Sequence, residues 1–197
     1  MAALVQTKMS AADEVYGREM QAVETIQAKA RQLILSGDAD SFARLHASGE
    51  LHANMVVQPH VRVGPGRLDG PWNVTALGFA ARHKKLNVMR QLIDLGANVH
   101  EETRELHGMA SLEAAAVGFD DGVELLLEKG CDFALGNSAA GGNGTTPVHA
   151  AASKGHLSTL RIFRTFGVCM TKADDMGMSP IFAANAYNHP GEYLKQH

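Results

Sequence analysis

The sequence predicts an all-α fold of stacked helix–turn–helix units, on the strength of three observations. First, one pattern recurs, and its copies start at Thr75, Ala110, Thr146 and Ser179. The steps are 35, 36 and 33 residues, which is a spacing typical of repeat architectures. Second, a glycine ends each full copy, at Gly96, Gly130 and Gly167. Third, aromatic residues make up only 6% of the 197 residues while alanine and glycine are plentiful, which favours closely packed helices.

The unit that starts at Thr146 shows why each copy forms two helices. In "TPVHAAASKGHLSTLRIFRTFG" (146–167), Thr146 suits a helix N-cap and Pro147 the first helical position. Gly155 supplies the turn between the helices, and Gly167 ends the second helix at a C′ position. The second helix carries an apolar stripe that only a neighbouring unit can cover. Stability is therefore expected to be shared between units.

Four full units and a truncated fifth are expected. An earlier copy, "AKARQLILSGDADSFARLHASGELHAN", occupies residues 28–54, and the fifth unit stops at His197. With Ala110 as its start, the third unit is about one residue short in its first helix.

These motifs resemble the ankyrin repeat family, over roughly residues 28–197. The unit at Thr146 is a near-complete match to the family pattern TPLHxAAxxGHxxxVxxLLxxG. The resemblance implies an ankyrin-repeat solenoid in which a β-hairpin finger follows each helix pair. The first finger, at 54–72, is enlarged by about a dozen residues and contains the extended stretch "MVVQPHVRV". Residues 1–27 form a leader that we expect to be a helix capping the stack; a partner-binding amphipathic helix is the alternative.

Candidate chemical groups are better explained by the fold. His149 and His156 straddle the Gly155 turn, without further ligands at zinc-site spacing, and His149 is expected to bridge backbone groups of adjacent loops. "GNSAAGGNG" (136–144) lacks the Lys and Ser/Thr of a phosphate loop and fits a finger tip. The sequence therefore predicts neither a metal, nor a cofactor, nor an enzymatic activity.

Composition narrows the partners. A net charge of −3 does not indicate nucleic-acid binding, and no apolar run is long enough to insert into a membrane. Cys131 and Cys169 are expected to be reduced, near-buried thiols, which favours an intracellular, cytoplasmic protein, with the nucleus as a second compartment. The protein is expected to be monomeric by itself.

The resemblance implies a noncatalytic scaffold or adaptor that binds another protein through its concave face and fingers. The alternative is a targeting module of a longer protein whose enzymatic or regulatory domain lies beyond His197. Trp72 either packs the enlarged finger or anchors an interface. The expected partner-binding residues are Arg62, Arg67, Trp72, Arg82, His83, Glu101, Glu102, Arg104, Asn143, Ser153, Lys154, Lys172 and Asp174.

Overall fold

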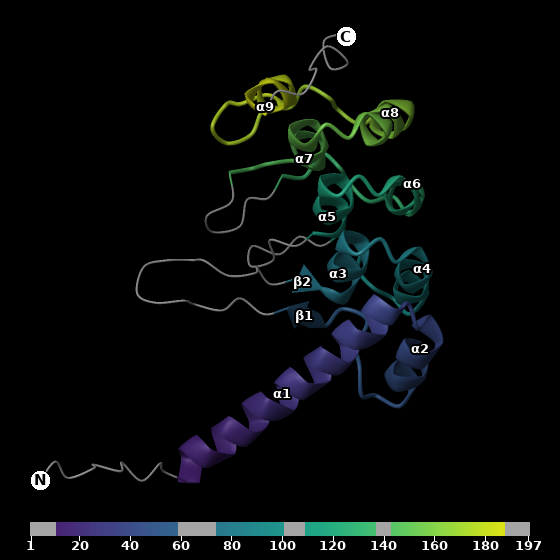
Figure 1. The fold of residues 1–197 in the computed structure, drawn as a ribbon, viewed down its shortest axis with the longest axis vertical. Coiled ribbons are helices and arrows are strands. Elements are labelled where there is room, and N and C mark those ends of the chain that lie inside the picture. The colour runs from purple at the N-terminus through teal and green to yellow at the C-terminus, as the bar shows by residue number, and fades with distance from the viewer. Residues whose placement is uncertain (1–10, 59–73, 101–108, 137–142, 188–197) are drawn as a thin grey trace, which may run out of the picture.

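The computed structural model describes residues 11–58, 74–100, 109–136 and 143–187, in which helices stack in two columns (Figure 1). The helices are α1 (Ala11–Ser36), α2 (Ala39–Ala47), α3 (Ala76–Arg82), α4 (Leu86–Asp94), α5 (Ala110–Ala116), α6 (Asp120–Glu128), α7 (Pro147–Lys154), α8 (Leu157–Thr165) and α9 (Pro180–Ala186). The inner column contains α3, α5, α7 and α9, and the outer column contains α2, α4, α6 and α8. The predicted all-α repeat solenoid is confirmed.

The inner helices begin at the predicted N-caps in three units. The hydroxyls of Thr75, Thr146 and Ser179 accept hydrogen bonds from backbone N–H groups three residues later. In the third unit the N-cap is Met109, one residue before the predicted start. The prediction of a short first helix was therefore wrong: α5 has 7 residues, as α3 does. The methionine has no side-chain oxygen, so the sequence lacked the usual capping signal there.

The turn between the two helices of a unit requires one residue with a left-handed backbone. Glycine occupies this position in three units, at Gly37, Gly118 and Gly155. In the second unit the residue is Lys84, with φ of 54°. A side chain in this region is strained, because Cβ crowds the following carbonyl.

The core runs along the stack between the columns. Leu92, Leu126 and Phe163 occupy the same position of α4, α6 and α8, and each is fully buried, with 0% of its surface exposed. Alanines of the inner helices, such as Ala114 and Ala115, are equally buried and let neighbouring helices approach closely. Each fully buried large side chain contributes about 2–3 kcal/mol, so most stability comes from contacts between units.

The base of the enlarged finger is an antiparallel strand pair. Strand β1 (Val56–Gln58) pairs with β2 (Val74–Thr75), and Val56 lies opposite Thr75. Part of the stretch predicted to be extended is thus a strand. The rest of the predicted finger, residues 59–72, lies outside the described residues.

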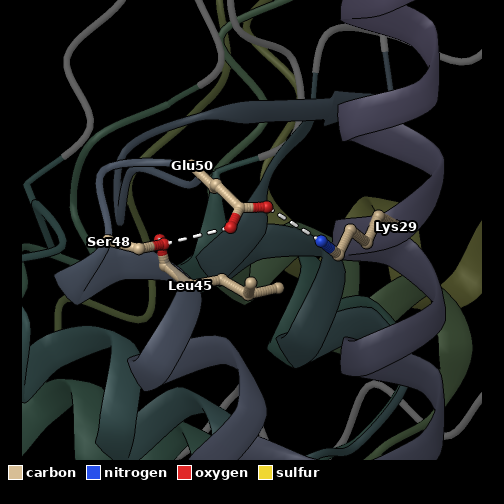
Figure 2. A network of polar contacts seen from close by, with 4 residues as sticks. All are labelled: Lys29, Leu45, Ser48 and Glu50. Carbon is tan, nitrogen blue, oxygen red and sulfur yellow. Dashed lines mark hydrogen bonds and ion pairs between the residues drawn. The ribbon is translucent and has the colours of Figure 1, made fainter.

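Helix α1 extends past residue 27, where the predicted leader ends, and continues into the first unit without a break. Its last third packs on the stack: Ala30 and Ile34 are fully buried, and the Arg31 Nη1 donates to the Val57 carbonyl at 2.5 Å. Figure 2 shows a second contact, an ion pair between Lys29 and Glu50, which lies in the loop after α2. The Lys29 Nζ is 2.9 Å from the Glu50 Oε2. Lys29 holds the pKa of the Glu50 carboxyl below its usual value.

Candidate protein-binding face

The C-terminal ends of the inner helices form a column of equivalent side chains. His83, Val117, Lys154 and Tyr187 each lie eight residues after the N-cap of their own inner helix. His83, Lys154 and Tyr187 are exposed and Val117 is half-buried. Neighbouring helices pack about 9 Å apart, so this edge column spans about 27 Å. Two of its members, Val117 and Tyr187, were missed by the sequence analysis. The predicted start at Ser179 already makes Tyr187 equivalent to Lys154, whereas Val117 becomes equivalent only with Met109 as the N-cap of α5.

Arg82, a predicted binding residue, holds two units together. Its Nε lies 2.7 Å from Glu113 Oε2, and its Nη2 lies 2.5 Å from Oε1, so the pair is bidentate. The Glu113 side chain is only 12% exposed, and its hydrogen bond with Arg82 raises the pKa of the guanidinium. The pair joins α3 to α5.

His83 follows Arg82 in the chain and packs against Phe79, with ring centroids 4.4 Å apart and the ring planes tilted by 50°. Partial burial lowers the pKa of the imidazole, and the positive charges of Arg82 and Lys85 lower it further. The ring therefore offers an aromatic face and a neutral hydrogen-bonding edge at neutral pH.

The predicted pair in the fourth unit has two different environments. Ser153 is half-buried, and its Oγ donates to the Ala150 carbonyl one turn earlier at 3.0 Å. Lys154 is exposed, so its side chain is available for contact with a partner. The column therefore contains Lys154 rather than Ser153.

Several predicted finger residues fix the fingers to one another. Lys172 Nζ donates to the Ala134 carbonyl of the preceding finger at 2.7 Å. Asp174 Oδ1 accepts from the N–H groups of Met176 and Met178 and so shapes its own turn. The Asn143 carbonyl accepts from the Asp175 N–H at 2.8 Å, while Asn143 itself is exposed. The other predicted residues lie outside the described part of the chain: Arg62, Arg67, Trp72, Glu101, Glu102 and Arg104.

The two histidines of the fourth unit have structural roles, as predicted for His149. Its Nδ1 accepts from the Thr146 N–H at 3.3 Å, so Nε2 carries the hydrogen and donates to the Met178 carbonyl at 2.9 Å. The His156 Nε2 lies 3.1 Å from the Ala116 carbonyl of the preceding unit. Across the described residues, His, Cys, Asp and Glu form no group of three that could hold a metal ion.

The cysteines differ in exposure. Cys131 is buried and donates to the Val99 carbonyl, but Cys169 is exposed, so the prediction of a near-buried thiol was wrong there. Cys169 follows the last helix of its unit, where finger residues leave the core. A hydrogen bond from the Thr171 backbone lowers the pKa of the Cys169 thiol.

Stacked helix pairs with an exposed inner edge define a repeat protein whose surface suits contacts with other proteins. A family model described as ankyrin repeats, in three copies, matches residues 113–194. Two similar relatives are "Cyclin-dependent kinase 4 inhibitor B" of Rattus norvegicus and of Mus musculus. Each is 30% identical over 113 residues, which covers 57% of this chain and 83% of the relative. The chain belongs to the ankyrin-repeat family.

Ankyrin repeats are in general noncatalytic modules for protein–protein interaction. In the described part of the chain, no helix combines the length and apolarity needed to cross a membrane.

Proposed function

We propose that this protein is a noncatalytic scaffold or adaptor that holds a protein partner against the edge column and the fingers. The observation that carries the proposal is the column itself, in which His83, Val117, Lys154 and Tyr187 stand at equivalent positions of four stacked helices. The column combines an imidazole, an aliphatic group, an ammonium and a phenol. This mixture suits a mixed polar and apolar protein surface.

Preorganisation is the mechanism. Backbone hydrogen bonds and the Arg82–Glu113 pair fix the spacing of the inner helices before any partner arrives. A rigid array loses little conformational entropy on binding, so more of the contact energy appears as affinity. The fingers add contacts beside the column, and the proposed set includes Asn143 and the residues of the enlarged finger. We also propose that the protein acts in the cytoplasm and is monomeric without its partner.

Affinity capture with quantitative mass spectrometry tests the proposal. The column variant carries His83→Ala, Lys154→Ala and Tyr187→Ala. The matched control carries Arg90→Ala, Glu124→Ala and Lys129→Ala. These exposed residues lie in the outer helices α4 and α6 or directly after α6. A partner retained by the wild type and the control but lost by the column variant supports the proposal. Partners that bind all three proteins equally contradict it.

Kinase inhibition is a second candidate, favoured by the match to 83% of the length of relatives named as inhibitors of cyclin-dependent kinase 4. The assay titrates the purified protein into that active kinase and follows phosphate transfer. Saturable inhibition that the column variant loses would support the candidate. Full kinase activity at saturating protein would remove it.

A further inference from the structure

The first two thirds of α1 extend beyond the stack. In Figure 1 the helix runs diagonally away from the first unit toward the N-terminus. It has 26 residues, whereas α3 and α5 have 7 each. Residues 17–26 are all exposed, and burial begins at Gln27. About 15 Å of described helix thus lies outside the core, at 1.5 Å per residue.

This extension carries an uncovered apolar stripe. Met20, Val23 and Ile26 are 51%, 48% and 41% exposed, and their spacing of three residues places them along one side of the helix. The same side continues into Ala30 and Ile34, which are fully buried against the stack. We call Met20, Val23 and Ile26 the α1 stripe. One apolar side of α1 is therefore buried against the protein at its C-terminal end and exposed to solvent at its N-terminal end.

Two carboxylates border the α1 stripe. Glu19 precedes Val23 by four residues and Glu24 follows Met20 by four, so each lies one turn from a stripe residue. Both are exposed, and no described cation forms an ion pair with either. Lys29, further along the helix, is held by Glu50. Helical spacing places Arg18 on the opposite side of the helix.

We propose that the α1 stripe binds one amphipathic helix of another protein, whose apolar face is flanked by Lys or Arg. Apolar side chains of the partner would cover Met20, Val23 and Ile26, and its cations would neutralise Glu19 and Glu24. A projecting helix of this length is marginal in water by itself, so a packed partner would also stabilise it.

The charges select this occupant over a second copy of the chain. Self-pairing through the stripe would bring the unpaired Glu19 and Glu24 of two copies together, which is repulsive. The carboxylates of Glu19 and Glu24 also disfavour binding to an anionic lipid surface, because the lipid headgroups would repel them. This surface is distinct from the edge column, so the inference does not depend on the proposed function.

Two designed helical peptides test the proposal with the full chain. Both carry the same leucine face; one has lysines beside it and the other has glutamates. Fluorescence anisotropy should show the lysine peptide binding at least about tenfold more tightly to the wild type, and more weakly as salt increases. In the charge-swap variant, Glu19→Lys with Glu24→Lys, the preference should reverse.

A stripe variant and a matched control complete the design. Val23→Gln with Ile26→Gln should abolish binding of the lysine peptide, whereas Gln21→Ala with Thr25→Ala, on the opposite side, should preserve it. Circular dichroism verifies that the stack remains folded. Equal affinity for the two peptides, or unchanged binding by the stripe variant, overturns the proposal. So does a stripe-dependent dimer in sedimentation equilibrium, or stripe-dependent binding to phosphatidylserine vesicles in place of the peptide.

Discussion

Among the residues that the structure describes, Lys84 has the backbone conformation least suited to its side chain. It occupies, with φ of 54°, the turn position that Gly37, Gly118 and Gly155 occupy in the other units. Its ammonium makes only a long contact, 3.4 Å, to the Gly118 carbonyl. Relief of the strain exceeds the loss of this exposed contact, so Lys84→Gly should stabilise the fold by about 0.5–1 kcal/mol.

Urea unfolding measures this difference, and Lys84→Ala is the control. Alanine keeps a Cβ in the left-handed region, so the control should not gain the same stability. Equal midpoints for the glycine and alanine variants would refute the explanation by backbone strain.

His83 should make stability depend on pH in a defined direction. Its folded pKa is lowered by partial burial and by Arg82 and Lys85, so the unfolded chain binds the imidazole proton first as pH falls through about 6.5. The contribution of His83 to stability is therefore constant above that pH and decreases below it. Between about pH 7.5 and about pH 5.5, the wild type should lose more thermal stability than His83→Gln. An identical loss in both proteins would contradict this prediction.

At the scale of elements, the Arg82–Glu113 pair joins α3 to α5. Arg82→Ala would leave a largely buried carboxylate without its bidentate partner, and the expected cost is about 2–3 kcal/mol in the free energy of unfolding. The double variant Arg82→Met with Glu113→Leu should recover most of this loss, because both charges are removed. Chemical denaturation of the single and double variants measures the coupling. If the double variant is as unstable as Arg82→Ala, the loss does not arise from the unpaired carboxylate.

His149 joins α7 to the next finger through the Met178 carbonyl. It is only 3% exposed, so His149→Ala would leave the Thr146 N–H and this carbonyl without a partner, at a cost of about 2–3 kcal/mol. Ser153→Ala is a fitting control, because its hydroxyl bonds within its own helix and should cost less than about 1 kcal/mol. Equal losses in thermal denaturation would show that His149 has no special role.

The same elements show how much of the fold and the candidate site the sequence could predict. The starts of three inner helices could be predicted from Thr75, Thr146 and Ser179, because a hydroxyl N-cap is a local sequence signal. Met109 gave no such signal, so the third start was displaced by one residue. Local patterns also could not show that Arg82 reaches Glu113 or that Cys169 is exposed, since both depend on how neighbouring units pack. Val117 is equivalent to Lys154 only when the third unit is aligned on Met109, its observed N-cap, whereas the predicted start at Ser179 already places Tyr187.

At the scale of the whole molecule, stability should vary along the stack. Each described unit contacts its sequence neighbours, so a central unit is supported on both sides. In α9, Pro180 and Ala184 are buried, whereas Phe182 is 57% exposed; Tyr187, which directly follows the helix, is 65% exposed. Phe182 stands at the position that His149 holds in α7, three residues after the N-cap. Phe182 is thus largely exposed at a position where His149 is buried.

Hydrogen exchange should therefore show the amides of α9 opening first and those of α5 and α6 opening last. Leu126→Ala, at a fully buried position of α6, should cost about 3 kcal/mol and accelerate exchange in the adjoining units as well as its own. Ala184→Gly, in α9, should accelerate exchange in the last unit while leaving α3 and α5 unchanged. If both substitutions raise exchange equally along the whole stack, the protein unfolds as one cooperative unit and the gradient of stability inferred from its packing is wrong.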